Sequence, residues 1–186
     1  MSGSVDLELA RWIADHRSSP LTRVCQALEH VGESPALFVV PAVAALAAFV
    51  ALNLWSELPR LAVAMFVTVA VTGTMQERLG RPRPPADLAL TTLHGPAMPS
   101  SHAVLTSSIL VVVLMLWPWT SRRARLVVAI TGAAGCLVIG AAMVYLGGHW
   151  LSDVLVGWAL GIVLTGGTML LWTRIGLPGG RRRAVA

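Results

Sequence analysis

Lysine is absent from this sequence, and charged residues of every kind are scarce. All 14 basic residues are arginine, and Asp, Glu, Lys and Arg together make up only 12% of the 186 residues. A soluble domain of this size has about 25% charged residues. Hydrophobic residues reach 55%, and the mean hydropathy is +0.71. The shortage of charge excludes an ordinary soluble enzyme domain and indicates a chain embedded in a bilayer.

Cysteine is also rare, and its placement excludes two kinds of site. Cys25 and Cys136 lie in unrelated segments without CxxC spacing, so we expect buried small side chains, and neither a disulfide nor a metal pair. The N-terminal region carries Asp6, Glu8 and Arg11 where a secretory signal would need an apolar core. We therefore expect the membrane spans to direct their own insertion.

Long apolar stretches are what the sequence does contain. Five of them approach the ~20 residues that cross a ~30 Å hydrocarbon core, and tryptophans fall at their ends, as at membrane interfaces. The stretches are residues 36–55, 58–76, 103–119, 126–147 and 150–172. The predicted fold is an all-α polytopic membrane helix bundle with about five transmembrane helices and further helices at the N-terminus.

Three regions are expected along the chain. Residues 1–34 form an amphipathic interfacial segment, in which 4–17 and 20–31 place apolar side chains on one helical face. Residues 35–175 hold the transmembrane domain, and residues 176–186 form a basic C-terminal tail.

Arginine placement predicts the topology. The net charge of +5 would suggest nucleic acid in a soluble protein, but these arginines lie at the ends of apolar runs, so no nucleic-acid partner is expected. If side A is the face that carries residues 1–34, side B holds eight arginines and side A six. The positive-inside rule makes side B cytoplasmic. The protein is expected to be a multi-pass protein of the plasma (inner) membrane, with side A extracytoplasmic.

Three polar patches, far apart in sequence, fall on side A at the ends of spans. They are residues 76–84 (QERLGRPRP), 99–102 (PSSH) and 148–153 (GHWLSD). Each patch alone has an ordinary explanation as headgroup-facing charge, helix cap or structural pair. Their convergence on one face favours a functional site, because ionisable residues at membrane depth are functional candidates.

Each patch offers groups that suit a phosphate. Arg78, Arg81 and Arg83 present planar charged forks that match phosphate oxygens. Ser100 and Ser101 open a predicted helix, where backbone N–H groups and the positive helix end can bind an anion.

The remaining residues supply acid–base and nucleophilic chemistry. His149 and Asp153 are spaced i, i+4, so on a helix they share one face, and the carboxylate can orient the imidazole as a nucleophile or base. His102 can then protonate a leaving oxygen. The sequence thus predicts a phosphate-handling site around the two histidines.

These patches resemble the signature of the type 2 phosphatidic acid phosphatase (PAP2) superfamily, which includes lipid phosphatases and vanadium haloperoxidases. The family pattern reads KxxxxxxRP, then PSGH, then SRxxxxxHxxxD, and the resemblance covers about residues 60 to 172. It implies that His149 forms a phosphohistidine, that Asp153 orients it, and that His102 protonates the leaving group. Arg83 and the amides around Ser100 and Ser101 would hold the phosphate. The resemblance to the lipid phosphatase branch implies that no metal or other cofactor is needed and that the substrate is a polyprenyl diphosphate or phosphatidyl phosphate in the membrane.

The sequence departs from that pattern at two cationic positions. Gln76 stands where the family has lysine, and Ala142 and Met143 stand where it has serine and arginine. Three explanations are open: Arg78 or Arg81 supplies the missing charge, the site is tuned for another substrate, or the protein binds a lipid phosphate without hydrolysing it. The sequence selects neither the lipid nor the oligomeric state.

Overall fold

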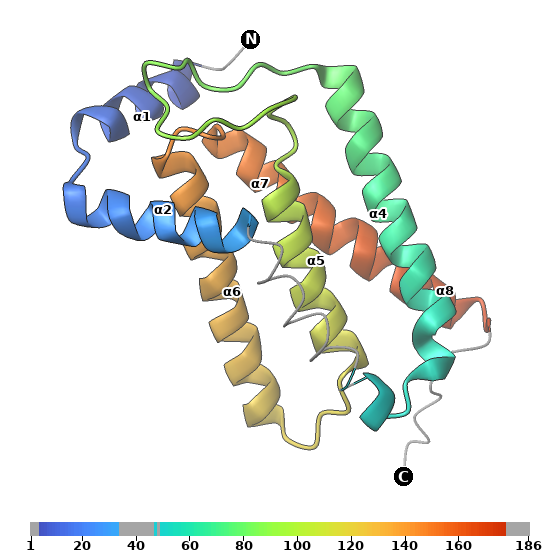
Figure 1. Cartoon of the computed structure of the whole chain (residues 1–186). Helices are drawn as coiled ribbons and strands as arrows, with labels where there is room; N and C mark the ends of the chain where they lie inside the picture. The colour runs from blue at the N-terminus through green and yellow to red at the C-terminus, as the bar shows by residue number, and fades with distance from the viewer. Residues whose placement is uncertain (1–3, 34–46, 48, 178–186) are drawn as a thin grey trace.

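A computed structural model describes residues 4–33, 47 and 49–177 of the chain. Within these residues all regular structure is helical (Figure 1). The elements are α1 (Ser4–Asp15), α2 (Ser19–Glu33), η1 (Trp55–Glu57), α4 (Leu58–Leu79), α5 (Ser101–Leu116), α6 (Arg122–Tyr145), α7 (Leu151–Leu160), η2 (Gly161–Thr165) and α8 (Gly166–Arg174). The predicted all-α class is confirmed.

Three described helical stretches are long and apolar enough to cross a membrane. They are Trp55–Leu79, Arg122–Tyr145 and Leu151–Arg174. The apolar helix α5 is shorter, at 16 residues. These four helices match the last four predicted spans, so the membrane-bundle prediction is confirmed for this part of the chain. The first predicted span, residues 36–55, lies largely outside the described residues, as does the end of the basic tail, so the three predicted regions stay a prediction.

Small residues let α5 and α7 approach closely at the centre of the bundle. A Cβ on Gly157 would lie 2.7 Å from Ala103 Cβ and 2.8 Å from Ser100 O, and one on Gly161 would meet Ser107 and Val104 O. Such small-residue contacts bring helix backbones together in membranes, where apolar burial gives little driving force between helices. The start of α5 is therefore held against the first half of α7.

Buried hydroxyls join three helices deeper in the bundle. Thr165, in the π-helical segment η2, donates to Ser108 Oγ of α5 at 2.9 Å and lies 3.0 Å from Thr68 Oγ1 of α4. All three side chains are buried. Polar side chains inside a membrane bundle need such partners because the surroundings offer no water, so these bonds fix α4 beside α5 and η2.

The two N-terminal helices pack on the end of the bundle that carries the polar patches (Figure 1). Ala10 of α1 packs on Ala97 and Trp150, and Cys25 of α2 packs on α6. Cys25 is buried as predicted, whereas Cys136 is only half-buried, and both are free thiols. The prediction of helices in the N-terminal segment is confirmed, and their placement at the membrane interface stays a prediction.

Candidate active site

The loop between α4 and α5, residues 80–100, folds over the turn between α6 and α7. Gly147 permits this crossing: its φ is +75°, and a Cβ there would lie 2.5 Å from Leu88 O. The N–H of Leu90 donates to Leu146 O at 2.7 Å, and Arg17 donates to Leu88 O and Tyr145 O. The loop is thereby fixed directly above the two histidine segments, and the convergence of the three patches is confirmed.

His149 is buried and its ring orientation is determined by a backbone carbonyl. Its Nδ1 lies 2.9 Å from Ala97 O, at the end of the crossing loop. A carbonyl oxygen only accepts hydrogen bonds, so Nδ1 carries the proton and Nε2 keeps its lone pair. That lone pair faces the guanidinium of Arg83, whose Nη1 lies 3.2 Å away.

Asp153 lies beside His149 but is not hydrogen-bonded to it. The expectation that both residues share a helical face is wrong, because α7 begins at Leu151 and His149 precedes it. The two side chains still approach, with Asp153 Oδ2 at 3.7 Å from His149 Nδ1. Oδ2 accepts the N–H of Trp150 at 2.9 Å and so caps α7. The carboxylate of Asp153 thus lies near His149 without a hydrogen bond to it, and the Ala97 carbonyl makes the hydrogen bond that the sequence led us to expect from Asp153.

Arg83 is held by carbonyl oxygens at the mouth of the site. It donates to Gly148 O at 2.7 Å, Gly95 O at 3.0 Å and His94 O at 3.1 Å. Desolvation by burial lowers the pKa of Arg83 and the negative charge of Asp153 offsets part of the change, yet a guanidinium stays protonated in proteins. Arg83 is thus a fixed positive charge next to His149 Nε2.

Arg81 does not face that position. Its Nη1 lies 2.6 Å from Asp153 Oδ1, and its Nη2 lies 2.7 Å from Asp6 Oδ2 on α1. Two carboxylates hold its guanidinium, so in this arrangement Arg81 is bound to the first turn of α7 and does not replace a missing phosphate ligand. Arg78 is exposed on the last turn of α4.

Asp6 is a residue of this network that the sequence did not single out. Burial raises its pKa, but hydrogen bonds from Ser152 and Arg81 outweigh that effect and hold the pKa below its ordinary value. One signal was available: Asp6 lies four and seven residues before Ala10 and Ile13, on the helix face that is otherwise apolar.

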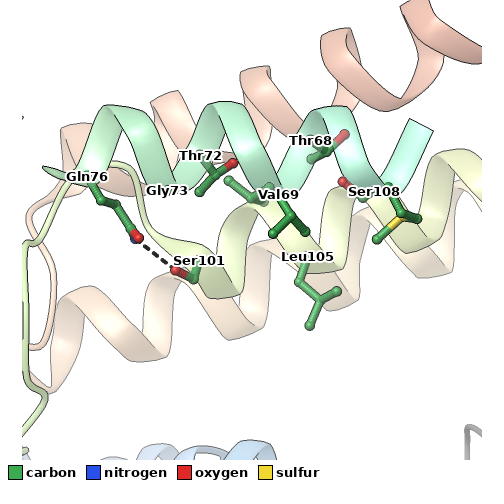
Figure 2. Close-up of a pocket in the computed structure, with 10 residues that line it drawn as sticks. Thr68, Val69, Thr72, Gly73, Gln76, Ser101, Leu105 and Ser108 are labelled. Atoms are coloured by element: carbon green, nitrogen blue, oxygen red, sulfur yellow. Dashed lines mark hydrogen bonds between the residues drawn. The ribbon is translucent and has the colours of Figure 1, made fainter. Parts of the chain in front are cut away.

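The start of α5 completes the site. Ser100 is its N-cap and is buried, while Ser101 opens the helix and is exposed. Next to it the ring of His102 lies 6.5 Å from that of His149, centroid to centroid, at an interplanar angle of 72°. Gln76 donates to Pro99 O at 3.0 Å. It also donates to Ser101 Oγ at 2.8 Å, the bond drawn in Figure 2. The Gln76 amide therefore lies at the N-terminus of α5 and adds no charge there.

A groove runs from this point between α4 and α5, from Gln76 and Ser101 at the left of Figure 2 toward Thr68 and Ser108 at the right. Its volume is about 270 Å³, and one end of it is formed by Gln76 and Ser101. Further along it is lined by Thr68, Val69, Thr72 and Leu105, among others. Most of the surface that lines the groove is apolar, with the hydroxyl side chains of Thr68, Thr72 and Ser108 along it and Gln76 and Ser101 at its end.

Most of the predicted site residues are therefore within one cluster. His102, His149, Asp153, Arg83, Ser100, Ser101 and Gln76 meet at one end of the bundle, Arg81 stands behind Asp153, and Arg78 lies apart. Met143 is 2% exposed, and its backbone O accepts from the N–H groups of Gly148 and His149. Among the described residues, no group of three His, Cys, Asp or Glu side chains is placed to hold a metal ion.

Comparison with known proteins agrees with this arrangement. The fold is similar to the crystal structure of the transmembrane PAP2-type phosphatidylglycerolphosphate phosphatase from Bacillus subtilis, with a TM-score of 0.77, 24% identity, and coverage of 97% of this chain and 88% of that one. It is also similar to Aquifex aeolicus LpxE, with a TM-score of 0.69, 21% identity, and coverage of 91% and 97%. No curated protein matches the sequence significantly. A sequence model of the PAP2 superfamily matches residues 57–176, which is more than half of the chain and spans all three patches. The chain therefore belongs to the PAP2 superfamily.

Proposed function

We propose that this protein is a metal-independent lipid phosphatase that acts through a phosphohistidine intermediate on His149. One observation carries the proposal: Ala97 O holds Nδ1 of a buried histidine, which leaves the Nε2 lone pair facing a fixed guanidinium. An oriented imidazole next to a permanent positive charge is what attack on a phosphorus atom requires.

In the first step Nε2 of His149 attacks the phosphorus, and the bond from phosphorus to the lipid oxygen breaks. A phosphoryl group entering the site would take the Arg83 N–H group that now points to Nε2, which frees the lone pair. Backbone amides at the start of α5 and the positive end of that helix add to the stabilisation. His102 is close enough to reach the leaving oxygen, to which it would give a proton.

In the second step water attacks the phosphohistidine and inorganic phosphate leaves. His102, now neutral, is the group that can accept a proton from this water. The imidazolium form of His149 that arises during turnover is stabilised by Asp153, whose carboxylate lies 3.7 Å from Nδ1.

The groove between α4 and α5 is the proposed place for the lipid chain. It is mostly apolar, opens between two helices of the bundle and ends at Gln76 and Ser101, so a chain lying there would bring its phosphate to the start of α5. Polyprenyl diphosphates and phosphatidyl phosphates both fit this description. With side B cytoplasmic, the reaction would take place at the extracytoplasmic face.

The proposal is tested by phosphate release from lipid vesicles or mixed micelles by the detergent-purified protein, with a chelator present. The substrates are a polyprenyl diphosphate, phosphatidic acid and phosphatidylglycerol phosphate, the last because a structural relative is named for it. His149→Ala should abolish release in a protein that still folds, as a cooperative melting transition in detergent would show. Equal release by the two proteins would reject the phosphohistidine mechanism.

A second function, binding of a lipid phosphate without hydrolysis, is favoured by one observation. Gln76 and Met143 replace two cations of the family pattern, and the guanidinium of Arg81 is held by Asp6 and Asp153. Each charge-assisted hydrogen bond contributes about 1.5–3 kcal/mol. Vesicle binding that depends on lipid phosphate, with no release from any lipid and no change in His149→Ala, would select this function.

A further inference from the structure

The first turn of α7 is held by a side chain from another helix. The carboxylate of Asp6, on α1, accepts the N–H of Ser152 at 3.2 Å and also the Ser152 hydroxyl. A helix leaves its first N–H groups without partners inside the helix. Here a residue nearly 150 positions earlier in the chain supplies one of those partners.

We infer that Asp6 is a positioning residue of the active site, an inference that rests on the proposed function. The surface helix α1 is then part of the phosphatase site. Asp6 does not touch His149. It acts through Arg81 and through the segment that connects His149 to α7.

The first connection is a chain of charged contacts. Arg81 Nη2 lies 2.7 Å from Asp6 Oδ2, and Arg81 Nη1 lies 2.6 Å from Asp153 Oδ1. One planar guanidinium thus spans the two carboxylates, and a planar fork held at both ends has a fixed orientation. Since the other oxygen of Asp153 faces His149, the position of that charge depends on Asp6.

This cluster is not an ordinary surface ion pair. The side chains of Asp6 and Arg81 are each 11% exposed, and that of Asp153 is fully buried. Exposed pairs contribute little because water and salt screen them, whereas in this buried cluster the loss of Asp6 leaves donor groups of Arg81 and Ser152 without their acceptor. Without Asp6, the Arg81 guanidinium would have one carboxylate partner and would turn or move.

The second connection is through packing. Ala10, one turn after Asp6, packs on Ala97 and Trp150. Ala97 supplies the carbonyl that holds His149 Nδ1, and Trp150 follows His149 directly. The inner face of α1 therefore supports both sides of the histidine, and Asp6 is the polar contact that fixes this face.

The outer face of α1 suits the membrane surface. Val5 is 71% exposed and Trp12 59% exposed, and they lie seven residues apart on one side of the helix. Tryptophan is favoured at the lipid headgroup level. A helix anchored in this way would tie the geometry of the site to the interface where the lipid substrate is found.

The test compares Asp6→Asn with Glu8→Gln, a matched loss of one carboxylate from an exposed position on the same helix. Asparagine keeps the size of the side chain but removes the negative charge. It also replaces one carboxylate oxygen, an acceptor for Arg81 and Ser152, by an NH₂ group that can only donate. We expect Asp6→Asn to lower kcat on the order of tenfold with KM nearly unchanged, because misplaced catalytic groups affect the chemical step. Glu8→Gln should match the unaltered protein, and Asp6→Glu should recover part of the loss.

Two further measurements separate positioning from general destabilisation. In an Arg81→Gln background, Asp6→Asn should lower kcat less than it does in the unaltered protein, because the connection through Arg81 is already lost and only the contact with Ser152 remains. Hydrogen–deuterium exchange should rise in the peptide that contains residues 149–153 for Asp6→Asn but not for Glu8→Gln. Additive losses of kcat in the double variant would overturn the inference.

The exchange measurement also separates the proposal that the protein is a phosphatase from the inference that Asp6 positions its active site. If the unaltered protein releases no phosphate, the phosphatase proposal fails, and exchange alone decides whether Asp6 fixes the histidine segment. If phosphate is released and Asp6→Asn matches Glu8→Gln in both kcat and exchange, the role of Asp6 is rejected and the phosphatase proposal stands.

Discussion

Arg83 Nη1 lies 3.2 Å from His149 Nε2, and the other nitrogens of the same guanidinium donate to the carbonyls of Gly95 and His94. Backbone carbonyls therefore bind one side of the Arg83 guanidinium, and its Nη1 faces the nucleophile His149. This arrangement ties phosphate binding and nucleophile position to a single side chain.

Replacing Arg83 by lysine should lower kcat/KM by about 10²-fold or more, the usual effect of removing a donor aimed at developing charge. Lysine keeps the positive charge, but a single ammonium cannot meet three carbonyls and a phosphate in the geometry of a planar fork. The measurement is steady-state phosphate release from phosphatidic acid in micelles. Arg23→Lys, at an exposed position on α2, should show no change, and an equally active Arg83→Lys would mean that only the charge matters.

His102→Asn should slow release according to the leaving group. General acid catalysis contributes roughly 10²–10⁴-fold, and it matters most when the departing oxygen is a poor leaving group. We expect a large loss with alkyl lipid phosphates and a small loss with an aryl phosphate, whose oxygen departs without a proton. Equal losses with both substrates would assign His102 to phosphate binding.

The general layout could be predicted because hydropathy alone determines it. Spans of about 20 apolar residues must cross the bilayer, and once they are counted, the ends of α4, α6 and the starts of α5 and α7 fall on one side. The charged and histidine residues at those ends are therefore brought to one end of the bundle, where most of them meet and Arg78 lies apart.

The contacts that orient the site could not be predicted. The Ala97 carbonyl carries no side-chain signal, and its use depends on how the loop of residues 80–100 crosses Gly147. The i, i+4 spacing of His149 and Asp153 suggested one helix, but Asp153 caps α7 and so places His149 before it. One of the two carboxylates that bind Arg81 belongs to Asp6 on α1, a tertiary contact that no local sequence pattern contains.

Gly147→Ala should destabilise the protein by about 1–3 kcal/mol, since a residue with a Cβ is strained at φ +75° and would also meet Leu88 O. Thermal unfolding in detergent measures this loss, and phosphate release should fall with it because the loop carries Ala97 and Arg83. Gly135→Ala is the matched control. Gly135 is helical and a Cβ there has nothing within 4 Å, so that change should be neutral or stabilise by roughly 0.5–1 kcal/mol.

Gln76→Lys tests whether the lost cation weakens the site or changes its substrate. The Gln76 amide donates to Pro99 O and Ser101 Oγ, and a lysine ammonium, which has three donors, can keep both bonds and add a charge at the start of α5. We expect KM for phosphatidic acid to fall about tenfold, the effect of one added charge-assisted hydrogen bond. Thr74→Lys is the control, because Thr74 lies two residues before Gln76 at an exposed position of the same helix. It should leave KM unchanged, which would show that a lysine at this end of α4 does not lower KM simply by attracting anionic lipid. A loss of turnover in Gln76→Lys, with the same melting temperature, would mean instead that the neutral amide is required and that the site recognises a lipid whose own groups need an uncharged donor there.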